Sequence, residues 1–193
     1  MSRQSPPAPP PWRQRMPSAP WPLDGRQGST AHHEAGHLVT ARLVGFTPGN
    51  AVASQGKGGR AMIGIDGNAP DPITTDELDR PMPPPEIYAE VFDQTWPGSW
   101  GGRSYQQAAF DYCTVVVAGR QAELINAGVE IAKPCAFPLW DHDHLVAIAI
   151  LNRVGENAAL GWCQARAREL LAANWDEVEQ QAEKIARDSK ATA

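Results

Sequence analysis

The 193-residue sequence lacks long apolar runs and basic clusters, and each absence excludes a class of protein. Its longest apolar stretches, residues 114–118 and 145–151, are far shorter than the roughly 20 residues that a membrane-spanning helix needs. The net charge is −5, and no cluster of Lys and Arg offers a surface for phosphate groups. We therefore expect neither a membrane nor a nucleic acid to be the principal partner of this chain.

Paired cysteines and a secretion signal are also lacking. Cys113, Cys135 and Cys163 are odd in number, widely spaced and without a C-x-x-C pair. This usage predicts buried thiols in a reducing compartment rather than a disulfide framework or a zinc knuckle. The first residues show no charged start followed by an apolar run, as a secretion signal would. Together these features predict a cytoplasmic location.

Proline is concentrated in two regions, which predicts where the chain has little regular structure. Residues 1–28 are Pro-rich and cannot bury enough apolar surface to order themselves, so we expect a disordered tail before one domain at 29–193. The second region, residues 66–102, is expected to be a loop insertion with one short helix around Ile87 to Phe92. Its Trp96 and Trp100 would either line a substrate cleft or attach the loop to the core.

The most specific pattern lies in the stretch HHEAGH, residues 32–37. It contains H-E-x-x-H, in which His33 and His37 are four residues apart and Glu34 follows the first of them. Side chains at i and i+4 are neighbours on a helix surface, so both imidazoles can bind one metal ion. Glu34 would flank that ion and take a proton from a water that the ion activates. The pattern predicts a zinc hydrolase, with coincidental histidines on an ordinary helix as the alternative.

The motif is expected to lie inside a helix that begins near Ser29 or Thr30 and stops at Gly45. Gly36 in the interior of that helix costs about 1 kcal/mol relative to alanine. A close approach of another backbone behind the metal site would explain it, and simple tolerance is the alternative.

The rest of the chain reads as mainly helical with one small β element. Asn174 is expected to cap the last helix, with Glu177 completing a capping box. A long helix from Ser104 is expected to end at Gly128, with a fully apolar central part. The expected strands are Asn50 to Ser54 and Ala61 to Ile65, and the expected helices after residue 100 are 104–127, 145–152, 156–173 and 175–190.

A catalytic zinc site needs a third protein ligand, and the sequence places it far from the motif. The pattern with a third histidine six residues on would need Gly at 40 and His at 43, where this chain has Thr40 and Leu43. No Asp, Glu or His occurs from residue 38 to 65. The richest cluster of candidates is the run DHDH, residues 141–144, at the start of a helix.

Several segments together resemble the peptidase domain of the FtsH-type, ATP-dependent zinc metalloproteases. The stretch AHHEAGHLVTARLVG is similar to the metal helix of that family, GRAMIG to a strand, and VVVAGRQAELI to its Gly-Gly-Arg-x-Ala-Glu helix. DHDHLVAIAI resembles the Asn-Asp-x-x-x-Ala segment that supplies the third ligand, and aligning Ala147 places that ligand at Asp143. The tail ARARELLAANWDEVEQQAEKIA is similar to the C-terminal helix pair. The resemblance implies a helical, zincin-like metallopeptidase fold that binds Zn²⁺.

The resemblance also implies an ATPase and further copies of the chain as partners, but this sequence differs from the family in several segments. The family joins this domain to an ATPase, whereas no phosphate-binding loop motif occurs here, so a separate ATPase or unfoldase would have to supply folded substrates. The ring of the family implies a possible homo-oligomer. The chain departs from the family in the segments 66–102 and 128–140. It also has Pro138 to Asp141 where the family has a Thr-x-Gly-Ala segment.

The expected roles follow from the motif and the resemblance. His33, His37 and Asp143 would bind zinc, and Glu34 would act as the general base of a metalloendopeptidase that cleaves unfolded or flexible polypeptides. The edge strand formed by Ala61, Met62, Ile63 and Gly64 would add the substrate as a further strand. A catalytically inactive, zinc-bearing binding or adaptor domain is the first alternative, and a metal-free helical interaction module is the second.

Some neighbouring residues have competing interpretations. Asp143 could instead cap a helix, although Asp141 stands in the better position for a cap. His142 and His144 are rival ligands, and His32 is expected to point away from the metal. Arg120 and Glu123, three residues apart on a helix, are expected to pair near the site.

Overall fold

The computed structural model describes residues 27–54, 58–64, 68, 70–99, 102–129 and 141–191. The predicted tail up to residue 26, Cys135 and the side chains of Trp96 and Trp100 lie outside this description. In chain order the elements are α2 (Gln27–Leu43), β1 (Thr47–Ser54), β2 (Gly58–Gly64), η1 (Thr75–Asp79), α3 (Pro85–Ser99), α4 (Tyr105–Val116), α5 (Ala118–Asn126), α6 (His142–Arg153), η2 (Asn157–Ala159), α7 (Leu160–Ala173) and α8 (Trp175–Ala191). The expected mainly helical fold with a small β element is confirmed.

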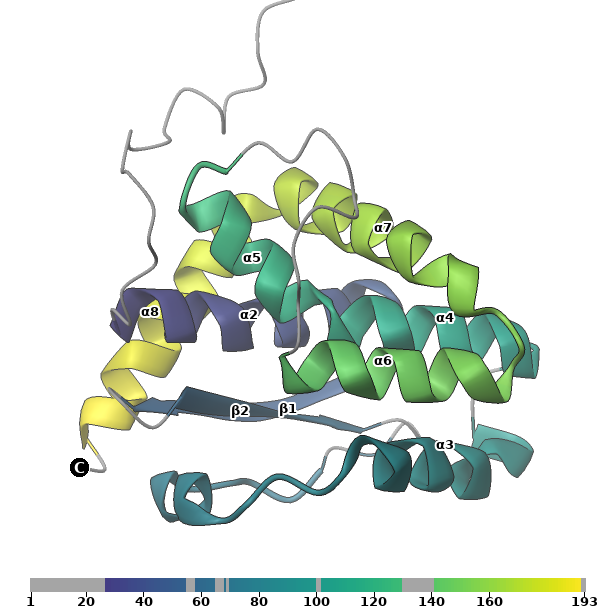
Figure 1. Ribbon diagram of the computed structural model, residues 1–193. Helices are drawn as coiled ribbons and strands as arrows, with labels where there is room; N and C mark the ends of the chain where they lie inside the picture. Colours follow the sequence, from purple (N-terminus) through teal and green to yellow (C-terminus); the bar gives the residue numbers. More distant parts are fainter. Residues whose placement is uncertain are drawn as a thin grey trace, which may run out of the picture.

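The metal-motif helix α2 is the centre of the fold. Figure 1 shows α5 and α7 on one side of it, the hairpin β1–β2 on the other, and the η1–α3 segment beyond the hairpin, while α8 passes α2 and reaches the hairpin. The core is built on the small or branched side chains of Ala31, Ala35, Leu38 and Val39. Among the helices that the structure describes, none combines the length and the apolar character needed to cross a lipid bilayer.

Gly36 lies where α2 passes closest to α5. A Cβ atom on Gly36 would lie 2.8 Å from both the carbonyl oxygen of Ala118 and the Cβ of Ala122. Such distances are well inside van der Waals contact, so only glycine lets the two helices approach this closely. The expected close backbone approach is confirmed, and it holds the metal-motif helix directly against α5.

The hairpin is longer than the sequence predicted. Its first strand begins at Thr47 rather than Asn50, because an irregularity in the pairing between Pro48 and Ala51 lets the chain pass the Pro-Gly step and remain a strand. The backbone N–H of Ala53 donates to Ser189 Oγ at 3.0 Å, so α8 covers the outer edge of β1. The other strand, β2, contacts α2 and η1 and lines one cleft together with α3 and α6.

The Pro-rich segment after the hairpin contains more regular structure than expected. The helix predicted around Ile87 to Phe92 extends over Pro85–Ser99 and begins with a proline, which fits the first position of a helix. Ala89 and Phe92 are each 1% exposed and anchor α3 to the core. The side chain of Asn50 donates to the carbonyl of Ile73 at 2.7 Å and accepts from its N–H at 2.9 Å, which ties the loop to β1.

The long helix predicted from Ser104 to Ala127 is wrong in one respect, because it is broken at Val117. The chain forms α4 up to Val116 and α5 from Ala118, and Figure 1 shows that the two helices point in different directions. The break follows four β-branched residues, 114–117, which are weaker helix formers than straight-chain residues. At the break, the carbonyl of Val115 accepts a hydrogen bond from the His37 imidazole at 2.8 Å.

The C-terminal helices agree with the sequence in place but differ in detail. Helix α6 begins at His142, three residues before the predicted start. Asn174 lies at the junction of α7 and α8, but the predicted capping box is wrong. The backbone N–H of Asn174 donates to the carbonyl of Leu171, and the Glu177 carboxylate pairs with Arg42 of α2. Cys113 and Cys163 are buried free thiols, as predicted, and burial raises the pKa of Cys163 to about 11.

Candidate metal centre

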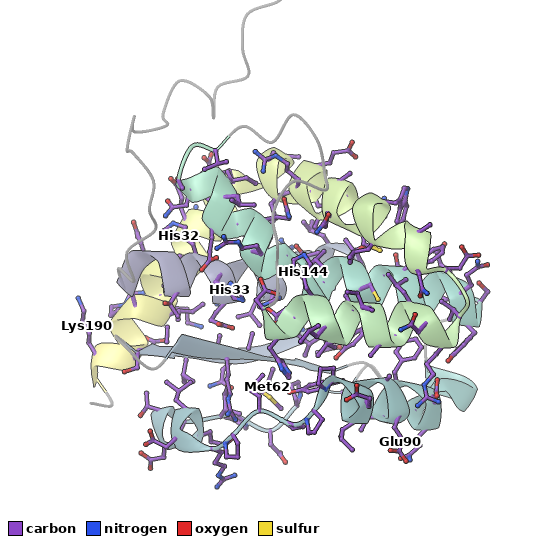
Figure 2. The ribbon with its side chains drawn as sticks, viewed as in Figure 1. His32, His33, Met62, Glu90, His144 and Lys190 are labelled. Carbon is purple, nitrogen blue, oxygen red and sulfur yellow. The ribbon has the colours of Figure 1, made fainter. Side chains whose placement is uncertain are left out.

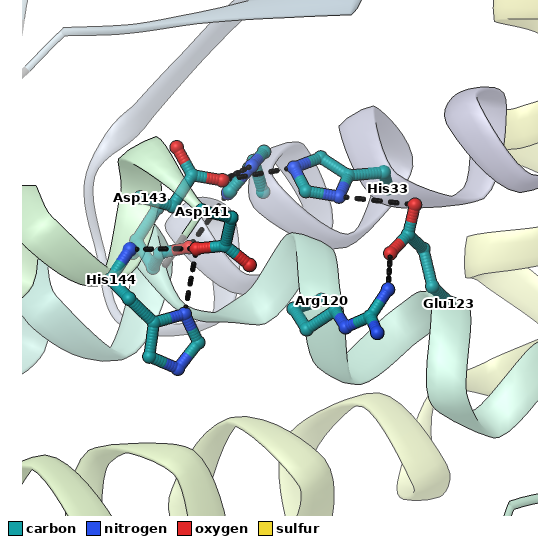
Figure 3. A network of polar contacts seen from close by, with 8 residues as sticks. His33, Arg120, Glu123, Asp141, Asp143 and His144 are labelled. Carbon is teal, nitrogen blue, oxygen red and sulfur yellow. Dashed lines mark hydrogen bonds and ion pairs between the residues drawn. The ribbon is translucent and has the colours of Figure 1, made fainter. Parts of the chain in front are cut away.

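Two histidines from α2 and one aspartate from α6 meet at the centre of the molecule. The rings of His33 and His37 lie 4.8 Å apart on one face of α2. The Nε2 atom of His33 is 2.9 Å from Asp143 Oδ2, and that of His37 is 3.3 Å from the same oxygen. Figure 3 shows how Asp143 reaches from the first turn of α6 to His33. The structure thus brings together the three residues that the sequence predicts as ligands.

The other ring nitrogen of each histidine is bonded to the protein. His37 Nδ1 lies 2.8 Å from the Val115 carbonyl, and because a carbonyl only accepts, this nitrogen carries the proton. His33 Nδ1 lies 3.5 Å from Glu123 Oε1, and Arg120 pairs with the same carboxylate at 2.7 Å (Figure 3). These contacts fix the orientation of each ring and point Nε2 towards Asp143, as outer partners do in metal sites.

The charges at the centre stabilise one another. Burial alone lowers the pKa of His33, but hydrogen bonds to Asp143 and Glu123 raise it well above its ordinary value. Burial raises the pKa of Asp143, but the two histidines outweigh it and hold that pKa far below its usual range. Asp143 is therefore ionised across the whole physiological range, which is the state that binds a cation.

The donor set fits a divalent metal such as zinc. The three ligand atoms of His33, His37 and Asp143 lie within 4.8 Å of one another. Tetrahedral Zn²⁺ with bonds of about 2.0–2.2 Å would separate its ligand atoms by about 3.3 Å, close to the 2.9 and 3.3 Å that separate Asp143 Oδ2 from the two histidine Nε2 atoms. Two imidazoles and one carboxylate also match the ligands of catalytic zinc sites, which leave a fourth position for water.

Gly119 lies directly against the two ligand histidines, and the sequence did not identify it as a residue of the site. A Cβ atom on Gly119 would lie 2.5 Å from the Nε2 atoms of both His33 and His37. Any side chain there would occupy the space in which the two nitrogens converge. The local signal in the sequence was a glycine inside the predicted helix 104–127, which indicates a close approach without revealing its partner.

Glu34 lies beside the ligands and is almost fully buried. It is 4% exposed, and a Cβ atom on Gly59 of β2 would lie 2.5 Å from its Oε1. Burial raises the pKa of Glu34, while the neighbouring imidazoles of His33 and His37 act in the opposite direction. The carboxylate is thus held between the metal ligands and the backbone of β2.

The remaining members of the DHDH run have other partners. Asp141 is the helix cap, since it accepts from the N–H of His144 at 2.9 Å. His144 is 2% exposed, with Nδ1 2.8 Å from Asp141 and Nε2 2.7 Å from the side-chain amide of Gln164. The ring of His142 packs edge-on to Tyr88, with centroids 5.4 Å apart. Asp143 is the member of the run that joins the two histidines of α2.

His32 points away from the centre, as the sequence predicted. Its ring stacks on Trp175 of α8, with centroids 5.8 Å apart and planes 13° from parallel. Figure 2 shows His32 and His33 side by side on α2 with their side chains directed differently. Of these two adjacent histidines, His33 is the one that belongs to the site.

The centre opens into a cleft of about 470 Å³. Its walls come from β2, α3, α4, α6 and the chain around residues 73–83. Ala61, Met62 and Ile63 of the predicted edge strand line this cleft, and Figure 2 shows Met62 directed from β2 towards the η1–α3 layer. Gly64 is buried at the far end of β2 and does not line the cleft; a Cβ atom on it would lie 1.8 Å from the carbonyl oxygen of Asn68.

The contact between Glu123 and His33 yields a first prediction. Replacing Glu123 by glutamine removes the negative charge that orients the His33 ring, so zinc affinity should fall about 10–100-fold. The measurement is competition with a chromophoric zinc chelator. Glu169→Gln, on the exposed side of α7, is the matched control and should leave the affinity unchanged. Equal affinities for both variants would contradict an orienting role for Glu123.

Comparisons of the chain with protein-family models, with curated proteins and with solved structures find no match. The likeness to FtsH-type peptidases therefore rests on the short motifs alone. What the protein does has to be inferred from the chemistry of the centre and its cleft.

Proposed function

We propose that this protein is a zinc-dependent metalloendopeptidase of the FtsH-peptidase type, with a zincin-like arrangement of helix and cleft. The observation that carries the proposal is the convergence of His33, His37 and Asp143 beside the buried carboxylate of Glu34, at the end of an open cleft. Two imidazoles, a carboxylate ligand and an adjacent base are the parts that metal-assisted peptide hydrolysis requires.

Each residue of the centre would have its own role in peptide hydrolysis. Bound zinc would polarise the scissile carbonyl and lower the pKa of its water. Glu34 would accept the proton of that water and deliver it to the leaving amine. His33 and His37, held by Glu123 and Val115, would keep the ligand geometry rigid so that little reorganisation is needed.

The substrate of this proposal is an unfolded or flexible polypeptide. Strand β2 pairs with β1 within the described residues, and its Ala61, Met62 and Ile63 line the cleft beside Glu34. An extended peptide could add along this strand with its backbone hydrogen bonds made to β2. A folded domain does not present such a segment, so a separate ATPase would have to unfold the domain and deliver it to this chain. In this proposal the chain works in the cytoplasm and could do so as a homo-oligomer.

The test is digestion of denatured casein, together with metal analysis of the same samples. Wild-type protein should contain about one zinc per chain and cleave casein. Glu34→Gln should retain the zinc and lose activity by about 10²–10⁴-fold, the contribution typical of a general base. Glu183→Gln, an exposed residue of α8, is the control and should match the wild type. Cleavage that persists in Glu34→Gln would contradict the proposed mechanism.

A zinc-bearing binding or adaptor domain is the second candidate. The observation in its favour is the near-complete burial of Glu34 against β2, which restricts the access of water to the carboxylate. In that case, metal analysis would show zinc while the wild type would leave casein intact. A chain without zinc after back-titration would instead indicate a metal-free interaction module.

A further inference from the structure

The cleft exposes an unusual share of the large apolar side chains. The structure describes five such side chains at the surface, and three of them, Met82, Ile87 and Val91, line this cleft with exposed fractions of 43%, 44% and 49%. Exposed apolar groups that gather at one place mark a binding surface more often than scattered ones do. Ile87 and Val91 are four residues apart and therefore project from the same face of α3.

The floor of this apolar region is joined directly to the metal ligands. Val146 lies one helical turn after Asp143 on α6, and Val116 follows Val115, whose carbonyl holds His37. Val116 is 9% exposed and Val146 is 3% exposed, so each presents only a small surface to the cleft. One turn of helix is about 5.4 Å, which is the scale of a single side chain. A group seated on this floor is therefore next to the reacting centre.

Outside the metal centre, few charged side chains line the cleft. Apart from the metal ligands, Glu34 and His142, the charged residues that line the cleft are Arg60 and Glu77. The Arg60 guanidinium donates to the carbonyl of Arg80 across the loop. The side chains that α3 and the valine floor present to this part of the cleft, Ile87, Val91, Val116 and Val146, carry no charge, so a charged group seated against them would lose its hydration without gaining a partner from them.

We infer that the cleft binds a polypeptide through one large apolar side chain, of the size of Leu, Met or Phe, seated between Ile87 and Val91 of α3 and the valine floor. This inference rests on the proposed function, since it names the side chain next to the scissile bond. It also makes the loop insertion, through α3, the part of the chain that determines substrate preference. A cleft of about 470 Å³ has room for such a side chain and the backbone on either side of it.

The test measures binding, so that it does not depend on turnover. The protein is full-length Glu34→Gln loaded with zinc, and the probes are three fluorescein-labelled Gly/Ser decapeptides with one central Leu, Ala or Asp. Fluorescence anisotropy should show the Leu peptide binding at least about 10-fold more tightly than the Ala or Asp peptide. Adding Val91→Asp should abolish that preference. Ile148→Asp, an exposed apolar position of α6 outside the cleft, should preserve it.

Equal affinity for the three peptides, or an unchanged Leu preference in the Val91→Asp protein, would overturn the inference. The inference would also be overturned if Val91→Asp left peptide binding unchanged and altered only the oligomeric state measured by light scattering. In that case the apolar surface would join two copies of the chain. A Leu preference in a wild-type protein that leaves casein intact would support the inference and reject the proposed peptidase. The two proposals can therefore fail separately.

Discussion

Replacing Asp143 by alanine is expected to remove stoichiometric zinc binding while the helices remain folded. Asp143 supplies the one anionic ligand, and its Oδ2 lies 2.9 Å from His33 Nε2 and 3.3 Å from His37 Nε2. Loss of a direct ligand should lower zinc affinity by more than the 10–100-fold typical of outer partners. The measurements are zinc content after dialysis and far-UV circular dichroism.

The matched control for Asp143 is its neighbour two residues away. Asp141→Ala removes the cap of α6, which should destabilise the protein by about 0.5–2 kcal/mol but leave one zinc per chain. Comparing the two variants separates a loss of ligand from a loss of helix stability. If zinc survives in Asp143→Ala and is lost in Asp141→Ala or His142→Ala, the third ligand has been assigned wrongly.

Gly119→Ala is expected to have an effect of similar size on zinc without removing a ligand. The added methyl group would stand 2.5 Å from the Nε2 atoms of His33 and His37, so one or both rings must turn away. Alanine is a better helix former than glycine, so helix content should not fall. Zinc affinity should drop more than about 100-fold, beyond the range of outer partners, as measured by chelator competition.

Gly36→Ala provides the comparison for Gly119→Ala. It crowds the same contact between α2 and α5, with its methyl group 2.8 Å from the carbonyl oxygen of Ala118, but it is directed away from the ligand nitrogens. Overpacking of this kind costs about 1–3 kcal/mol, which thermal unfolding would detect in both variants. Equal losses of zinc affinity in the two proteins would indicate a general shift of α2 rather than a block at the site.

The parts of the site that depend on local spacing could be predicted from the sequence. His33 and His37 share a helix face because they are four residues apart, and that relation needs no knowledge of the fold. Asp141 follows from its position before a helix. The choice of Asp143 within the DHDH run needed the family resemblance, because three of its neighbours carry equally plausible groups.

The parts that depend on distant contacts could not be predicted in the same way. The break at Val117 is not visible in an apolar run, because the same residues fit one buried helix as well as two. The bond of His37 to Val115 joins residues 78 positions apart, and a carbonyl leaves no trace in a sequence pattern. The length of α3 was underestimated because prolines at its start resemble a loop, although Pro85 is compatible with a first helical turn.

The contact between His33 and Asp143 also bears on how the protein folds. It joins residues 110 positions apart in the sequence, so the centre can assemble only after a very long loop has closed. Loop closure is paid for in chain entropy before its contacts form, which makes such a centre a late event in folding. The centre is thus a cross-link that holds α6 to α2, in addition to any chemistry it performs.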